Sequence, residues 1–233
     1  MNDAYDEYAD AYDQWFLKNR NLFLSEAKLV ASFLEGAGRA LSVGCGSGLF
    51  ESYWRREMGI DIAEGIEPAA AMADIARKRG MRVTVATAED FRADGEYDTV
   101  LLNGCPSYID DLARAFRNAH AALRPGGRIV VADVPKESAY ALIYNLALAV
   151  GTWDHPLLEG VQPPDPYPIE FVKAARWRTS REKEDHLRAA GFADFRWRQT
   201  RTVHPCRAND AIEEPIDGND RGSYVAVCAR KAP

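Results

Sequence analysis

The segment that most constrains the fold of this chain runs from Ala40 to Glu51 and reads Ala-Leu-Ser-Val-Gly-Cys-Gly-Ser-Gly-Leu-Phe-Glu. Four mostly apolar residues lead into three glycines at alternate positions, and an amphipathic stretch begins at Leu49. This order predicts a strand, a tight turn and the first turn of a helix. Glycine accepts positive φ and leaves no Cβ where a ligand approaches, and the first N–H groups of a helix lack internal partners. The segment therefore predicts a binding turn.

The spacing of the three glycines narrows the class of ligand. A dinucleotide-binding turn reads G-x-G-x-x-G and would need a small residue at position 49, where this chain has Leu49. A P-loop would need a lysine and a hydroxyl residue after the last glycine, and no lysine lies nearby. The spacing G-x-G-x-G therefore disfavours a pyrophosphate as the ligand of this turn.

Composition excludes several other kinds of protein. The chain has 233 residues, 47% hydrophobic and 27% charged, which suits one globular domain. A net charge of −6 without a basic block disfavours a nucleic-acid surface. Four cysteines without C-x-x-C spacing predict reduced thiols and no metal site. With no signal peptide and no apolar run long enough to span a bilayer, we expect a soluble, cytoplasmic protein, either monomer or homodimer.

Predicted strands and helices alternate along the rest of the chain. We predict strands at 63–67, 82–86, 97–103, 128–134, 193–203 and 222–230, and helices at 3–35, 69–79, 108–123, 138–150 and 179–190. Glu67 ends the second strand, 23 positions after Gly44. A doubly wound fold places there the carboxylate that accepts hydrogen bonds from both ribose hydroxyls of a nucleotide.

The end of the strand at 97–103 is a second place where ligand-binding residues are expected. Ligands of open α/β sheets bind beyond the carboxyl ends of the strands, where the strand order reverses, so Asn103 and Gly104 are candidates. Tyr108 either faces a substrate or packs under the following helix. Cys105 lies beside the site without a recognisable histidine partner, which favours a bystander thiol over a nucleophile.

Four features in order resemble the class I S-adenosylmethionine (SAM) dependent methyltransferases that act on small molecules. They are the glycine turn, the strand end at Glu67, the loop at Ala88-Glu89, and the Leu-Arg-Pro-Gly-Gly turn at 123–127. The resemblance implies a Rossmann-like α/β fold with a seven-stranded mixed sheet, its last strand antiparallel, and helices on both faces. It divides one domain into an N-terminal helical arm (1–36), a SAM-binding half (37–134), a substrate-covering insertion (135–178) and a C-terminal part (179–233). Ser42 departs from the family, which usually has an acid there.

The resemblance also implies cofactor-binding residues. Tyr12, in an aromatic arm that includes Tyr5 and Tyr8, would fold over SAM, and Met72 would lie against adenine. The adenine edge would meet a backbone N–H near Ala88 and the carboxylate of Glu89, with Asp90 as second choice. The full expected cofactor set is Tyr12, Gly44, Cys45, Gly46, Gly48, Glu67, Pro68, Met72, Ala88, Glu89, Asn103 and Gly104.

The expected acceptor site lies in the insertion, which is too long for an ordinary loop and too aromatic for disorder. Trp153, Tyr167 and Trp177 are predicted substrate-binding residues, and His155 is the predicted general base, with Tyr108 and Tyr12 as alternatives. Glu214 or Arg221 is a further candidate for the mouth of the site.

The implied function is methyl transfer from SAM to a small-molecule acceptor, which leaves S-adenosylhomocysteine (SAH). A non-catalytic SAM-binding module is the alternative, because Ser42 replaces the usual acid. A nicotinamide-dependent oxidoreductase is disfavoured by Leu49.

Overall fold

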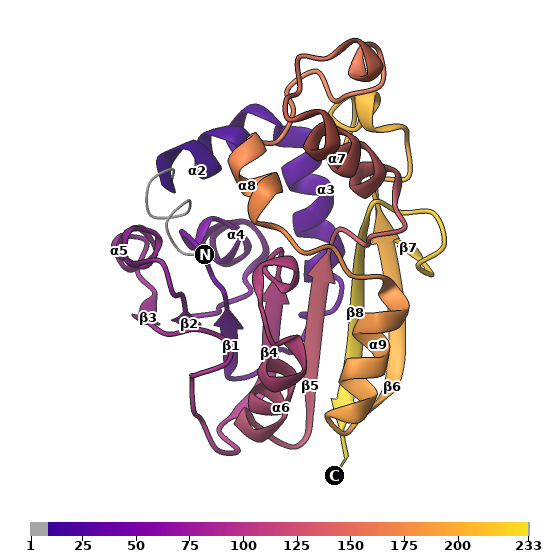
Figure 1. Cartoon of the computed structure of the whole chain (residues 1–233). Helices are drawn as coiled ribbons and strands as arrows, with labels where there is room; N and C mark the ends of the chain where they lie inside the picture. The colour runs from indigo at the N-terminus through magenta and orange to yellow at the C-terminus, as the bar shows by residue number, and fades with distance from the viewer. Residues whose placement is uncertain (1–8, 233) are drawn as a thin grey trace.

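A computed structural model describes residues 9–232, so Tyr5 and Tyr8 of the predicted arm lie outside the described residues. An eight-stranded sheet runs through the molecule in the order β3-β2-β1-β4-β5-β8-β6-β7 (Figure 1). The strands are β1 (Ala40–Val43), β2 (Glu64–Ile66), β3 (Arg82–Thr84), β4 (Tyr97–Asn103), β5 (Leu123–Asp133), β6 (Phe192–Thr200), β7 (Ile216–Asp217) and β8 (Tyr224–Lys231). β1 to β5 are parallel, and β8 is antiparallel to both β5 and β6. The prediction of a mixed sheet with an antiparallel last strand is confirmed, but the sheet has eight strands rather than the predicted seven, because the short strand β7 adds to its edge.

The order of the strands reverses between β1 and β4. From β1 the chain builds β2 and β3 on one side, and then returns to add β4 and β5 on the other. Ser42 of β1 lies beside Gly65 of β2 and Leu101 of β4 in the register of the sheet. The loops after β1 and β4 therefore leave the same edge of the sheet side by side, which is where open α/β sheets bind ligands.

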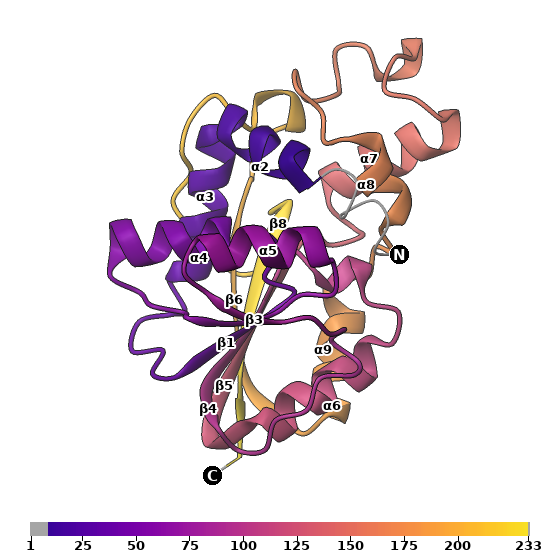
Figure 2. The ribbon, with the colours of Figure 1, turned by 90° about the vertical axis from the view of Figure 1, so that its left-hand side faces the viewer.

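Two apolar cores cover the two faces of the sheet. Alternate residues of β4 point to opposite faces, so Leu101 joins one core while Val100 and Leu102 join the other. The helices on the first face are α3 (Arg20–Ala31), α4 (Leu49–Tyr53), its π-helical continuation η1 (Trp54–Met58), and α5 (Ala70–Lys78). The helices on the second face are α6 (Leu112–Ala122) and α9 (Ser180–Ala189) (Figure 2). Burial on both faces explains why the central strands are almost continuously apolar.

The N-terminal arm and the insertion lie together over the carboxyl ends of the strands (Figure 1). The arm is α2 (Ala9–Lys18) followed by α3, and the insertion holds α7 (Ala139–Val150), the 3₁₀ turn η3 (Pro156–Leu158) and α8 (Ile169–Ala174). Two further 3₁₀ turns are η2 (Pro106–Tyr108) and η4 (Pro205–Arg207). The prediction of a single helix over 3–35 is wrong, because Asn19 is non-helical and its side chain instead donates to Asp165 of the insertion.

Several element boundaries also differ from the sequence prediction. The helix predicted from residue 108 begins at Leu112, because the Asp111 side chain caps its first turn. β6 ends at Thr200 rather than at residue 203, since Arg201 has a φ of +57° and leaves the extended conformation. The two-residue strand β7 forms inside the stretch predicted as a surface loop, where it pairs with Arg198 and Gln199.

No helix within residues 9–232 is long and apolar enough to cross a membrane.

Candidate functional site

The glycine turn between β1 and α4 has the backbone that its sequence predicts. Gly44, Gly46 and Gly48 have φ values of 70°, 54° and 70°, in the left-handed region that side chains disfavour. A Cβ added at Gly44 would lie 2.6 Å from the Cβ of Cys105, so this position has no room for a side chain. A Cβ at Gly46 would meet no atom within 4 Å, because Gly46 faces a cavity.

This outer cavity has a volume of about 400 Å³, a size typical of small-molecule sites. It lies over the carboxyl ends of β1, β2 and β4. Ten of the twelve predicted cofactor-binding residues line it: Tyr12, Gly44, Gly46, Glu67, Pro68, Met72, Ala88, Glu89, Asn103 and Gly104. Cys45 and Gly48 do not line it. Cys45 is buried behind the turn, and burial raises the pKa of its thiol well above the ordinary value.

Glu67 holds the glycine turn against the end of β2. Its Oε2 accepts a hydrogen bond from the backbone N–H of Gly46 at 2.8 Å, and its Oε1 accepts one from Ala69 at 2.9 Å. A carboxylate accepts more than two hydrogen bonds, so this contact is compatible with a ligand hydroxyl at the same group. Glu67 therefore shapes the outer cavity as well as lining it.

Glu89 and Asp90 have different surroundings, although both line the outer cavity. Glu89 Oε1 accepts from the backbone N–H groups of Asp110 and Asp111, at 3.0 and 3.1 Å, just before α6. Asp90 is exposed and pairs with Arg114 at 3.0 Å. The loop after β3 is thus tied to the first turn of α6.

Ser42, the departure from the expected acid, has a buried carboxylate beside it. Its hydroxyl donates to Oε1 of Glu51, from α4, at 2.6 Å. Burial raises the pKa of Glu51 to about 7, against the opposing effect of the hydrogen bond from Ser42. Neither residue lines the outer cavity. Sequence reasoning missed Glu51, whose only signal was an acid on the buried side of a short helix.

A polar cluster fastens α2 to the glycine turn. Asp13 Oδ1 accepts from the Ser47 hydroxyl at 2.5 Å, and its Oδ2 accepts from Arg79 at 2.6 Å. Arg79 also donates to the backbone carbonyl of Ser47 at 2.8 Å. Tyr12, the residue before Asp13, lines the outer cavity. The cluster therefore holds Tyr12 over that cavity.

A second, inner cavity of about 50 Å³ adjoins the outer one. The two cavities share four lining residues: Tyr12, Asn103, Gly104 and Tyr108. Nine aromatic side chains line the inner cavity: Tyr12, Trp15, Phe16, Phe50, Tyr108, Tyr144, Tyr167, Trp177 and Tyr224. Its three charged lining residues are Glu26, Asp133 and Arg201.

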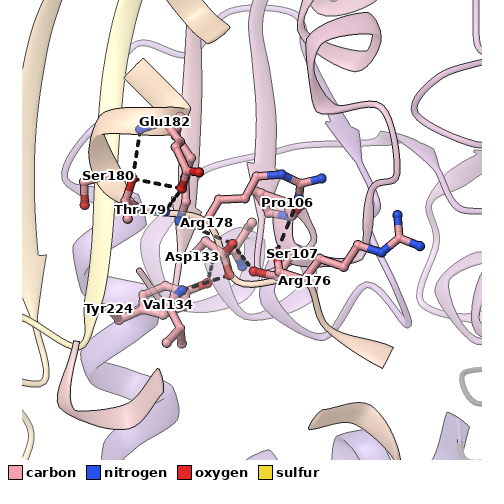
Figure 3. A network of polar contacts seen from close by, with 12 residues as sticks. Pro106, Ser107, Asp133, Val134, Arg176, Arg178, Thr179, Ser180, Glu182 and Tyr224 are labelled. Atoms are coloured by element: carbon pink, nitrogen blue, oxygen red, sulfur yellow. Dashed lines mark hydrogen bonds and ion pairs between the residues drawn. The ribbon is translucent and has the colours of Figure 1, made fainter. Parts of the chain in front are cut away.

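The carboxylate of Asp133, at the end of β5, fixes the turn that carries Tyr108 (Figure 3). Asp133 Oδ2 accepts from the Ser107 hydroxyl at 2.6 Å and lies 3.4 Å from the buried ammonium of Lys183. Its Oδ1 accepts from the N–H of Val134 at 2.8 Å. Both carboxylate oxygens of Asp133 therefore have partners, and these contacts fix η2 and Tyr108 beside the inner cavity.

Glu26 and Arg201 form an ion pair in the wall of the inner cavity. Arg201 Nη1 donates to Glu26 Oε1 at 2.6 Å, and both side chains are only 3% exposed. Burial raises the pKa of Glu26 to about 7, against the opposing effect of Arg201. A positive φ is unusual for a residue other than glycine, so Arg201 reaches this position through a strained backbone. Sequence reasoning missed both residues.

The insertion contributes some of its predicted residues to the inner cavity and not others. Tyr167 and Trp177 line it, whereas Trp153 lies behind them and donates its indole N–H to the Tyr167 carbonyl at 2.9 Å. His155 lines neither cavity. Its Nδ1 accepts from the N–H of Leu157 and caps η3, so the structure does not bring it to the site.

Glu214 and Arg221 also lie away from both cavities. Glu214 pairs with Lys28, and the backbone N–H of Arg221 donates to the Gln199 side chain. Among residues 9–232, no group of three or more histidine, cysteine or acidic side chains is arranged to hold a metal ion.

Comparison with known proteins agrees with this geometry. Residues 16–194 match the family described as "Methyltransferase domain". The chain is 27% identical over 231 residues to an uncharacterized protein of Methanocaldococcus jannaschii, and the match covers 98% of each.

Two solved structures show the same fold. A SAM-dependent methyltransferase of Thermotoga maritima, described as a possible histamine N-methyltransferase, is 30% identical with a TM-score of 0.84, and the match covers 99% of this chain and 100% of that one. A geranyl diphosphate C-methyltransferase of Streptomyces coelicolor, solved with Mg²⁺, geranyl diphosphate and SAH, is 17% identical with a TM-score of 0.61. That match covers 88% of this chain and 78% of the Streptomyces chain.

Proposed function

Since this chain belongs to the methyltransferase-domain family and is a class I SAM-dependent methyltransferase, we propose that it methylates a small molecule held in the inner cavity. The observation that carries the proposal is the wall of Tyr12, Asn103, Gly104 and Tyr108, which borders both cavities. A cofactor in the outer cavity and an acceptor in the inner one would meet along this wall. The described small-molecule activities of the Thermotoga and Streptomyces proteins are consistent with such an acceptor.

The residues of the outer cavity fit SAM. The open space above Gly46 admits a ligand close to the backbone, and the carboxylate of Glu67 is suited to the ribose hydroxyls. Met72 offers an apolar thioether for the adenine face, while Asn103 and Gly104 would take the methionine end. Tyr12 would cover the bound cofactor from α2.

Positioning is the main contribution that we assign to the protein. When bound, SAM supplies a methyl group already activated by its positively charged sulfur. Holding two reactants in the correct geometry can lower a barrier by about 7–11 kcal/mol. The aromatic lining of the inner cavity would orient a small acceptor and exclude water, with Tyr108 and Tyr12 on its cofactor side. His155 has no part in this mechanism, because it lines neither cavity.

Calorimetric titration with SAH tests the cofactor half of the proposal. We expect one-to-one binding by the wild type and a loss of about 1.5–3 kcal/mol of binding free energy in Glu67→Ala, the scale of hydrogen bonds to a charged group. Glu57→Ala, which changes an exposed acid, should bind as the wild type does. Equal affinities of all three proteins for SAH would show that Glu67 does not bind the cofactor.

The methyl-transfer part of the proposal is tested by incubating the protein with SAM and a panel of small alcohols, phenols, amines, imidazoles and thiols. We expect SAH and one methylated product to form together in equal amounts, as measured by mass spectrometry. SAH binding without turnover of any member would instead favour the non-catalytic SAM-binding module.

A further inference from the structure

Arg201 brings to the inner cavity one edge of its guanidinium that has no hydrogen-bond partner. Its Nη1 donates to Glu26 Oε1 at 2.6 Å, whereas its buried Nε and Nη2 meet no acceptor within residues 9–232. The side chain is 3% exposed and lines the inner cavity. Nε and Nη2 lie along the same edge of a guanidinium, and their N–H groups match the two oxygens of a carboxylate. Buried donors without acceptors are costly, and a ligand with such oxygens would remove that cost.

Trp177 adds a third buried donor to the same cavity. Its indole Nε1 also meets no acceptor among the described residues, and its ring lines the cavity. The ring stacks on Tyr144, with centroids 5.2 Å apart and planes 28° apart. The guanidinium carbon of Arg201 likewise lies 3.5 Å from the centroid of the Tyr140 ring. Aromatic packing therefore holds both donors in place before a ligand binds, which lowers the entropy lost on binding.

The charges around the inner cavity admit an anion. Glu26 is paired with Arg201, and the carboxylate of Asp133 lies 3.4 Å from the buried ammonium of Lys183. The two carboxylates are thus offset by two cations. Both oxygens of Asp133 already have partners, whereas the free hydrogen-bonding groups of Arg201 and Trp177 are all donors. The cavity is therefore suited to a group that accepts hydrogen bonds.

The volume of the inner cavity, about 50 Å³, sets the size of that group. One water-sized group needs about 10–15 Å³, so about three or four heavy atoms fit, as in a carboxylate and the carbon that bears it. The rest of a larger molecule would lie along the wall of Tyr12, Asn103, Gly104 and Tyr108, which the inner cavity shares with the outer one.

We propose that the inner cavity binds the carboxylate group of the methyl acceptor, with Arg201 donating through Nε and Nη2 and Trp177 through its indole N–H. The two oxygens of a carboxylate have enough lone pairs for all three hydrogen bonds. This inference rests on the proposed methyl transfer, and it names a small carboxylic acid as the class of substrate. Arg201 and Trp177 would orient that acid by its carboxylate.

Titration of the SAH-loaded protein with acetate, acetamide and acetamidinium tests the assignment. These probes share one shape and carry a negative charge, no charge and a positive charge. The indole region of the ¹H–¹⁵N NMR spectrum reports on the site, because the chain has only five tryptophans. At constant ionic strength, we expect acetate to shift one indole signal saturably. Acetamide should bind about ten-fold more weakly, the scale that separates hydrogen bonds to charged and neutral groups, and acetamidinium should cause no shift.

Trp177→Phe keeps an aromatic ring and removes the indole N–H. We expect it to lack the shifting signal and to bind acetate several-fold more weakly, as measured by saturation transfer to the acetate methyl group. Trp197→Phe is the matched control, because the Trp197 indole donates to Glu184 and lines neither cavity. It should keep both the signal and the affinity.

Arg201→Lys keeps the positive charge and removes the two-pronged edge. We expect acetate to bind about ten-fold more weakly, because an ammonium cannot donate in the same paired geometry. If this variant fails to fold, Trp177→Phe and the ranking of the three probes by the wild type still decide.

Protonation of Glu26 should strengthen acetate binding, because the carboxylate of Glu26 competes with the ligand for Arg201. Burial raises the pKa of Glu26 to about 7, against the opposing effect of Arg201, and Asp133 raises it further. Tyr12, from α2, and Tyr224, from β8, have pKa values raised by burial, so both stay protonated. Lowering the pH from 8 to 6 should therefore tighten acetate binding by up to about ten-fold, with less change for acetamide.

A protein that binds SAH but whose Trp177 signal does not respond to acetate, or responds equally to acetamidinium, would overturn the carboxylate assignment and leave the methyl-transfer proposal standing. Absence of SAH binding would overturn the proposed function, and with it the assignment of this cavity to an acceptor.

Discussion

Glu51 places a buried carboxylate beside the position where an acid was expected. Ser42 occupies that position, and its hydroxyl donates to the carboxylate of Glu51 from α4. The carboxylate lies behind the glycine turn and not in the outer cavity, so its effect on a ligand would pass through the turn. The acid at this end of β1 is therefore supplied from α4, behind the glycine turn rather than in the outer cavity.

The buried carboxyl of Glu51 should make stability depend on pH. Its pKa is about 7 in the folded protein and near its ordinary value of 4.5 in the unfolded chain. The folded state therefore keeps a proton that the unfolded state releases, and the free energy of unfolding falls as pH rises from 4.5 to 7. Glu51→Gln removes this titration. Relative to the wild type, we expect the variant to gain up to about 3 kcal/mol between pH 4 and pH 8.

Urea unfolding at a series of pH values measures this difference. Glu57→Gln, at an exposed position, should follow the wild-type curve throughout. A wild type and Glu51→Gln that keep a constant difference across the range would show that Glu51 titrates normally in the folded state.

At the scale of elements, Asp13 supplies the polar link between α2 and the glycine turn, beside the apolar packing of Phe16 against Phe50. Its contacts to Ser47 and Arg79 join the arm to the glycine turn and to the residue after α5, and the Asp13 side chain is 9% exposed. The pair of Lys18 with Asp165 joins α2 to the insertion, with Lys18 69% exposed. Partly buried, charge-assisted hydrogen bonds are stronger than solvated ion pairs, so these two links should differ in strength.

Asp13→Asn should therefore loosen α2 while leaving the sheet intact. We expect faster amide hydrogen exchange in residues 11–18 and an SAH dissociation rate raised about ten-fold, which corresponds to the loss of one charge-assisted hydrogen bond. Lys18→Gln is the matched control, and its exchange and dissociation rates should change by less than about two-fold. If the two variants behave alike, Asp13 is not the residue that fastens the arm.

At the scale of the whole molecule, occupation of the outer cavity should stabilise the fold. A ligand that binds only the folded state at about 100 times its Kd adds about 2.7 kcal/mol. For a chain of this size, we expect SAH to raise the thermal midpoint by about 5–10 °C. NADH at the same concentration should leave the midpoint unchanged, because Leu49 breaks the spacing of a dinucleotide turn. A shift with NADH equal to that with SAH would contradict this reading.

The sequence predicted the layers of this molecule and the outer cavity because local patterns encode both. The glycine turn, Glu67 at the end of β2 and Asn103 at the end of β4 each follow from a strand end and the order of strands. The inner cavity depends instead on α3, the end of β6 and β8 meeting in space. Glu26 and Arg201 lie 175 positions apart, and no local pattern joins them. His155 was chosen for its residue type within the insertion, and its side chain turned out to cap η3.

The wall that Tyr12 shares between the two cavities has a kinetic consequence. Because Tyr12 of α2 lines both cavities, an outward movement of α2 would open them together. A cofactor in the outer cavity and an acceptor in the inner one would then leave through the same opening. The two products would then depart after the same opening event, and the frequency of that event would cap the turnover number however fast the bond exchange is. Residues far from the reacting atoms, such as Asp13, would in that case govern catalytic throughput.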